Sequence, residues 1–242
     1  MARTRARSRA AAHLAAVATG PLGALSHDEV GVVFEALATP LEPLVAVALA
    51  STCKGLRAPS LAALAELRRR HEAAKALCRK AGTSCAAGSE ATALGWGAMG
   101  LTVADCTALA NVITTHGLPR LEALGLRANR FGAEGMQALA EGLGGGALPS
   151  LTYLGLNFNE IGEAGASALG AALSRGALPR LQRLHLSVNA LGSAGLIALA
   201  PGLRVHPQLK ELNLVKNGIG DDGVAALVAP GEGVLPSLEE LY

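Results

Sequence analysis

The chain has 242 residues, of which 50% are hydrophobic, 17% charged and 2% aromatic, and its formal net charge is +2. This composition is not that of a disordered protein, and it supplies enough Leu, Val, Ile and Ala for an aliphatic core. The charge is unevenly distributed, since residues 1–24 carry four arginines and no acid, whereas residues 91–242 carry nine basic and twelve acidic side chains. A net charge of −3 over the longer segment matches a phosphate backbone poorly, so we expect a protein partner and no nucleic acid.

The spacing of the cysteines argues against a metal site or a bound cofactor, and the hydropathy pattern argues against a membrane-spanning helix. Cys53, Cys78, Cys85 and Cys106 form no C-x-x-C pair, and no histidine lies nearby at metal-ligand spacing. Reduced intracellular thiols, with no metal site and no cofactor, are therefore expected. No apolar run reaches the roughly 20 residues of a membrane helix, which predicts a soluble chain without a membrane partner.

Residues 1–24 form an Arg-rich, acid-free and Ala-rich start. Such a segment is typical of a basic disordered tail, and it is also what an organelle transit peptide looks like. We interpret it as a tail, with the transit peptide as the alternative. The expected location is cytoplasmic or nuclear, or an organelle if the segment directs import.

Residues 25–80 predict a helical segment. Polar residues after Leu25 are able to cap a first helix, whose apolar positions follow at helical spacing. Two prolines then break the chain before a second apolar helix, Leu44–Leu56, and a third follows at Leu61–Lys80. Residues 81–90 are small and polar, which predicts a linker.

One phrase recurs through the rest of the chain. Copies begin at Leu121, Leu151, Leu181 and Leu209, and a partial copy begins at Leu238, with spacings of 30, 30, 28 and 29 residues. A period in this range predicts a solenoid. A worn copy at 91–120 is expected to cap the array, and the full copies occupy 121–150, 151–180, 181–208 and 209–237.

Each copy predicts one strand, one turn and one helix. A Leu-x-Leu alternation marks a short strand with one buried face, and a pair of glycines then flanks the start of a helix. An asparagine at a fixed position after the strand is able to bond backbone groups in the turn, and stacked copies predict a ladder. The ladder residues are Asn129, Asn159, Asn189 and Asn217. Because the cap copy has Met99 at this position, the ladder should start at the second copy.

The last copy, 238–242, consists of one strand position with no helix behind it. We expect either a truncated chain or a sheet edge that a partner completes.

These copies resemble the ribonuclease-inhibitor-like class of leucine-rich repeat over about 150 residues. The resemblance implies an α/β fold, a right-handed solenoid in a short arc. Parallel strands would lie on its concave side and helices outside, and a small helical segment would precede it.

The segment Leu25–Arg57 resembles an F-box. It has acids shortly after Leu25, the pair Val33-Phe34, a Pro-Leu-x-Pro-Leu sequence and a closing Ser-Thr-Cys-Lys. It departs from the family pattern in two places, since Ser26 replaces the usual proline and the family's late Trp is absent. The resemblance implies contact with a ubiquitin-ligase adaptor through Leu25, Val33, Phe34, Leu37 and Leu44. The alternative is a helical hairpin that only caps the first repeat.

If the strands lie in register, their outward side chains form columns on the concave face, and Arg183 falls between Tyr153 and Glu211. One interpretation is a self-contained ladder, in which Arg183 stacks on Tyr153 and pairs with Glu211. The other, which we prefer, is a recognition patch for a protein target. The predicted patch is Arg127, Tyr153, Asn157, Arg183, His185, Glu211, Asn213 and Glu240.

No catalytic residues are predicted. The glycine run 142–146 follows a helix and lacks the Lys-Ser/Thr ending of a phosphate loop, and His185 has no expected carboxylate and nucleophile partners. The chain is therefore predicted to bind a protein rather than catalyse a reaction. It would act as a substrate receptor of a cullin-type ubiquitin ligase, or alternatively as a non-ligase scaffold or GTPase-activating-type regulator.

Overall fold

The computed structural model describes residues 46–48, 61–115, 117–228 and 235–242. The chain divides into two units, Met1–His71 and Glu72–Tyr242. Residues 46–48 are helical and fall inside the second predicted helix, and α5 spans Leu61–Lys80 as predicted. The remaining predictions for residues 1–60 lie outside the described residues. These include the adaptor-binding positions Leu25, Val33, Phe34, Leu37 and Leu44.

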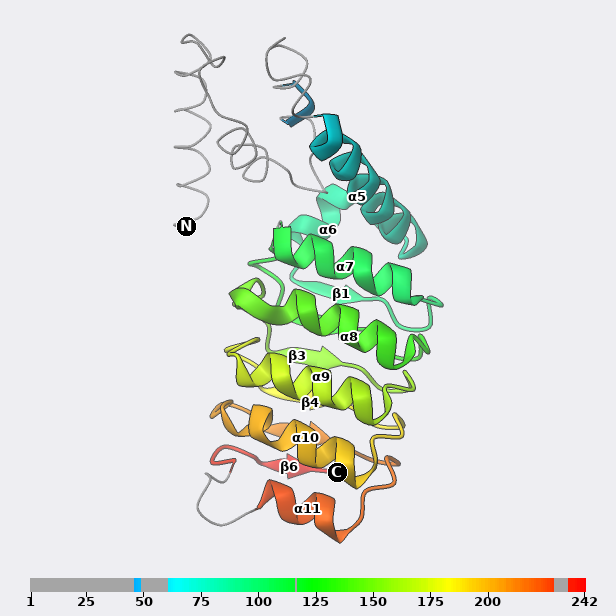
Figure 1. Ribbon diagram of the computed structural model, residues 1–242. Helices are drawn as coiled ribbons and strands as arrows, with labels where there is room; N and C mark the ends of the chain where they lie inside the picture. Colours follow the sequence, from blue (N-terminus) through cyan, green and yellow to red (C-terminus); the bar gives the residue numbers. More distant parts are fainter. Residues whose placement is uncertain (1–45, 49–60, 116, 229–234) are drawn as a thin grey trace. The chain divides into compact units, whose positions relative to one another are not determined.

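The second unit alternates parallel strands with helices. Its described strands form one sheet in sequence order, and Figure 1 shows α7 to α10 stacked as one layer over that sheet. The strands are β1 (Ala93–Gly95), β2 (Ala123–Gly125), β3 (Tyr153–Gly155), β4 (Arg183–His185), β5 (Glu211–Asn213) and β6 (Glu240–Leu241). The helices are α6 (Cys85–Glu90), α7 (Val103–Thr115), α8 (Gly132–Leu143), η2 (Gly144–Gly146), α9 (Gly162–Ser174), α10 (Gly192–Arg204) and α11 (Asp221–Leu227). An α/β repeat solenoid with an open sheet, preceded by a helical region, confirms the predicted fold class.

The segment 81–90, predicted to be a linker, contains the helix α6. Ser84 caps it, because its hydroxyl accepts a hydrogen bond from the Ala87 backbone N–H at 3.1 Å. Gly82, with a φ of +66°, turns the chain between α5 and α6. The composition of the segment suggests a loop because Ser and Gly favour loops, but the same residues favour helix termini.

Within the second unit, the end of α5 is joined to the first repeat. Lys80 Nζ donates to an Asp105 carboxylate oxygen at 2.7 Å and to the Gly100 carbonyl at 2.6 Å. Asp105 also accepts from the Thr102 backbone and hydroxyl, which caps α7. Burial acts to raise the pKa of Asp105, but the bonds from Lys80 and Thr102 outweigh it and lower that pKa below its ordinary value.

The core lies between the sheet and the helices. In each full repeat the leucine at the centre of the strand and the leucine that follows the last strand residue are buried. A leucine of the following helix is buried in the same layer. Each such side chain contributes about 1.5–3 kcal/mol by leaving water, and its neighbours in adjacent repeats share the contact. The strand residues between the leucines are thereby held on the opposite face of the sheet.

The asparagine of each full repeat fixes the turn after the strand. Asn159, which is fully buried, donates through Nδ2 to the Leu126 and Leu156 carbonyls at 2.9 Å, and its Oδ1 accepts from the backbone N–H groups of Asn129 and Arg130. Asn129, Asn189 and Asn217 bond in the same way. Asn129 Oδ1 accepts from Met99 and Leu101, so the ladder begins at the second repeat and closes the turn of the cap repeat.

In the described part of the chain, no helix is both long enough and apolar enough to cross a membrane.

Candidate functional site

The register of the sheet arranges the outward side chains in columns. We call the face of the sheet opposite the helices the strand face. Its first column is Ala93, Ala123, Tyr153, Arg183, Glu211 and Glu240, and its second is Gly95, Gly125, Gly155, His185 and Asn213. Equivalent repeat positions therefore lie side by side on adjacent strands.

Arg183 stacks on Tyr153, with its guanidinium carbon 5.2 Å from the ring centroid. The pairing of Arg183 with Glu211 that we considered from the sequence does not form. Glu211 Oε1 instead bonds to His185 Nε2 at 2.7 Å. The side chains of His185 and Glu211 are only 21% and 22% exposed, so their bond is shielded from water. Arg183 instead places its guanidinium over the Tyr153 ring and stays exposed.

His185 links Glu211 to Tyr153. An ionised carboxylate only accepts hydrogen bonds, so Nε2 carries the proton in the bond to Glu211. In the neutral ring Nδ1 is then an acceptor, and the Tyr153 hydroxyl lies 3.4 Å from it. The rings of Tyr153 and His185 pack edge to face, with their centroids 5.1 Å apart. The expectation that His185 lacks a carboxylate partner was wrong, because Glu211 reaches it diagonally from the adjacent strand.

Tyr153 lies over Gly155. A Cβ at residue 155 would lie 2.5 Å from the tyrosine hydroxyl oxygen, so any side chain there would displace the ring. Glycine at this position thus allows Tyr153 to lie along the sheet, where Arg183 and His185 hold it. The structure brings Tyr153, Arg183, His185 and Glu211 together as one cluster, which we call the Tyr153 cluster.

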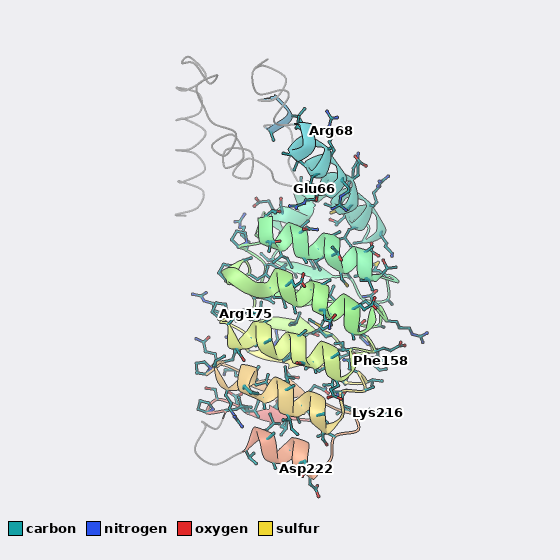
Figure 2. All side chains as sticks on the ribbon, viewed as in Figure 1. Glu66, Arg68, Phe158, Arg175, Lys216 and Asp222 are labelled. Carbon is teal, nitrogen blue, oxygen red and sulfur yellow. The ribbon has the colours of Figure 1, made fainter. Side chains whose placement is uncertain are left out.

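A second pair lies after β2 and β3. The Arg127 guanidinium carbon is 5.1 Å from the centroid of the Phe158 ring, and Phe158 is 41% exposed. Figure 2 shows Phe158 along the same edge of the repeats as Lys216, with Arg175 at the opposite edge. Phe158 was missed in the sequence because it lies in the turn. The signal available was its aromatic ring at a position where other repeats have Ala128, Val188 and Lys216.

Asn157, Asn213 and Glu240 make their side-chain hydrogen bonds outside the Tyr153 cluster. Asn157 Oδ1 accepts from the Ser187 backbone N–H at 2.9 Å and from its hydroxyl at 2.8 Å. Asn213 accepts from the Val215 backbone N–H within its own turn, at 3.2 Å. At the β6 end, Glu240 accepts from the Tyr242 hydroxyl at 2.7 Å. These contacts orient side chains rather than build a reactive centre.

The strand face over β1 and β2 carries only small side chains. Its first and second columns there consist of Ala93, Gly95, Ala123 and Gly125. Among the described residues, a Cβ added at Gly95 would meet nothing within 4 Å, so the described part of the chain leaves the space in front of Gly95 open. Large groups brought by a partner would find room beside Tyr153.

The described residues include no group of three or more His, Cys, Asp or Glu side chains able to hold a metal ion. Cys78 and Cys106 are buried. Burial raises the pKa of the Cys106 thiol to about 12, and burial together with a hydrogen bond to Cys85 does the same for Cys78. Both thiols are therefore protonated near neutral pH and are poor nucleophiles or metal ligands.

A family model described as Leucine Rich repeat matches residues 147–170, 178–200 and 205–228. The matches include β3 to β5 and most or all of the helix that follows each strand. The three units within residues 147–228 are thus similar to leucine-rich repeats, a class that generally mediates protein–protein interactions and is typically non-catalytic. A comparison with curated proteins gave no match.

Proposed function

We propose that this chain is a protein-interaction module that binds its target on the strand face. The observation that carries the proposal is the Tyr153 cluster, in which a tyrosine and an arginine stack at the centre of the sheet. Tyr and Arg are enriched among residues that dominate binding energy, and a stacked pair loses little conformational freedom on binding. The open surface over β1 and β2 gives a partner access to this pair.

The experiment is affinity capture by the full chain, with quantitative mass spectrometry of the bound proteins. We expect Tyr153→Ala with Arg183→Ala to remove a specific set of bound proteins. Ala123→Trp, which places a large ring on the open surface, should remove the same set. The matched control is Gln137→Ala with Arg175→Ala, two exposed residues that belong to the helix layer.

Each variant is first checked for wild-type circular dichroism and thermal stability. A set of partners that depends on both strand-face changes and survives the control supports the proposal. Partners that survive both strand-face changes overturn it, and so do partners lost only in the control.

We further propose that the repeats are of the ribonuclease-inhibitor-like type. The helices after β2, β3 and β4 have 12, 13 and 13 residues, which supports a full helix in each of these repeats. In that class targets bind on the strand face, where the Tyr153 cluster lies in this chain.

A second candidate function is that of a substrate receptor of a cullin-type ubiquitin ligase. Its support is the F-box resemblance of Leu25–Arg57 placed directly before the repeats. The test is capture of the purified ligase adaptor by the full chain, with Phe34→Ala plus Leu37→Ala as the variant. The candidate is supported if the wild-type chain captures the adaptor and the variant does not. If a folded wild-type chain captures no adaptor, the scaffold without ligase linkage remains.

A further inference from the structure

We propose that the partner of the strand face is an acidic protein segment, and that two of its carboxylates bind Arg127 and Arg183. This inference rests on the proposed function, since it names the chemistry of the partner at the same face. It is carried by two arginines that are stacked on aromatic rings and lack carboxylate partners within the described residues.

Arg183 has an acidic neighbour that is already engaged. Glu211 lies opposite Arg183 in the register of β4 and β5, but its carboxylate bonds to His185 at 2.7 Å. No described carboxylate lies within ion-pair distance of Arg183, which is exposed. The guanidinium is thus held by the Tyr153 ring while its N–H groups remain open to an incoming acid.

Arg127 has uncharged neighbours in its column. Gly97 lies on one side of it, and Asn157 lies on the other, where the Asn157 carbonyl accepts from the Ala128 backbone N–H. The side-chain oxygen of Asn157 is already bonded to Ser187. Arg127, which is exposed, therefore stacks on Phe158 without a carboxylate partner in the described part of the chain.

Stacking prepares both arginines for carboxylates. A ring that covers one flat face of a guanidinium leaves the N–H groups at its edge free, and this planar edge matches the two oxygens of a carboxylate. The stack also restricts a long side chain before binding, so less conformational entropy is lost when the ion pair forms. Lysine lacks both the planar edge and the stack.

The two arginines set a spacing for the partner. Arg127 and Arg183 are two strands and four positions apart, so their Cα atoms are separated by roughly 16 Å, which an extended segment spans in about five residues. The Tyr153 ring over Gly155 lies between them. Towards β6, Glu211 and the exposed Glu240 repel further acidic groups, which confines the acidic segment to β2, β3 and β4.

The experiment is selection from a random-peptide display library on the full wild-type chain, followed by binding measurements with the selected peptides. We expect peptides with two Asp or Glu residues spaced about five apart. Arg127→Ala and Arg183→Ala should each weaken these peptides about tenfold to hundredfold, as expected for a charged hydrogen-bonded pair. Arg183→Lys should restore only part of the loss. Selection on Arg183→Glu should favour Lys or Arg at the corresponding peptide position.

The outcomes separate this inference from the proposed function. All variants are checked for folding by thermal unfolding, and the two altered arginines are exposed. Two results overturn the inference but leave the proposed function standing. In the first, Ala123→Trp blocks binding of the selected peptides, but these peptides are not acidic. In the second, Ala123→Trp blocks their binding, but neither arginine variant weakens it. If no selected peptide depends on the strand face, both fail.

Discussion

Gly202 of α10 lies directly against Gly170 of α9, so that a Cβ at residue 202 would be 2.5 Å from the Gly170 carbonyl oxygen. The reverse side of the contact is equally tight, since a Cβ at Gly170 would be 2.5 Å from the Ala198 carbonyl oxygen. In both cases the obstacle is backbone, which a rotamer change does not relieve. The two helices therefore pack backbone to backbone, and this contact fixes the separation of neighbouring repeats.

Gly202→Ala should lower the free energy of unfolding by about 1–3 kcal/mol, the usual cost of overpacking, because the helices must separate to admit the methyl group. Urea denaturation followed by circular dichroism measures this. The control is Gly144→Ala, where φ is −61° and a Cβ meets nothing within 4 Å. Equal stability of the two variants would contradict the backbone contact.

His206 occupies the turn position that Leu178 holds in the preceding repeat. Each accepts a hydrogen bond through its carbonyl from the residue three positions later, and each is buried, with 3% of His206 and 1% of Leu178 exposed. Burial lowers the pKa of His206 below its ordinary value of 6.5, although a hydrogen bond to the Leu173 backbone opposes the shift. Among the described residues, His206 Nε2 has no hydrogen-bond partner. The histidine is thus a neutral, incompletely satisfied group in a leucine column.

His206→Leu should raise the free energy of unfolding by roughly 1–2 kcal/mol, because it removes the unpaired nitrogen and restores the leucine. Below pH 6.5 the unfolded chain binds a proton at His206 more readily than the folded chain does. Stability therefore falls as the pH decreases through that value, and the fall should be shallower in His206→Leu. Denaturation measured from neutral to mildly acidic pH tests this, with Leu178→His as the reciprocal variant. An unchanged pH slope in His206→Leu would show that other groups cause the decline.

The period of the repeat was sufficient to predict the strands, the helices and the strand register of the repeats, but not the helix α6 that precedes them. Because equivalent positions of a stacked repeat must lie side by side, the neighbours Tyr153 and Arg183 follow from alignment of the sequence with itself. The bounds of α5 likewise follow from its apolar spacing. These features depend on backbone periodicity, which a single sequence records directly.

The partner of Glu211 was not predictable in the same way. Arg183 lies directly opposite Glu211 in the register, and His185 lies diagonally opposite it. The spacing in the sequence therefore allows Glu211 to pair with either residue. The choice depends on burial and on the stack between Arg183 and Tyr153, which are properties of the packed side chains. Phe158 was overlooked for a related reason, since the strand pattern ends before its turn.

Asn159 provides the bonds that close one full turn of the ladder. Asn159→Ala should lower the free energy of unfolding by roughly 2–4 kcal/mol, because the buried Asn129 N–H and the part-buried Arg130 N–H lose their partner. The Leu126 and Leu156 carbonyls each lose one of two bonds and keep the bond from Asn129 or Asn189. Asn157→Ala is the matched control on the strand face. Its partner, Ser187, is half-buried and able to bond water, so a loss under about 1 kcal/mol is expected. A comparable loss in both variants, measured by urea denaturation, would argue against the ladder as the main stabilising network of the turns.

The residue after the ladder asparagine adopts the left-handed conformation in each full repeat. It is Ala190 in one repeat, with φ of 54°, and Gly218 in the next, with φ of 68°. A Cβ at Gly218 would meet nothing within 4 Å, so the difference between the two residues there is one of backbone strain alone.

Ala190→Gly should therefore stabilise the chain by about 0.5–1 kcal/mol, since the relief of strain exceeds the added entropy of the unfolded state. Gly218→Ala should cost about 1 kcal/mol for the same reason. Ala171→Gly, at an exposed position inside α9, is the control with opposite sign, because there glycine only adds entropy to the unfolded chain and about 0.5–1 kcal/mol is lost. If Ala190→Gly destabilised the chain as Ala171→Gly does, contacts of the Ala190 methyl group would have to outweigh its left-handed backbone.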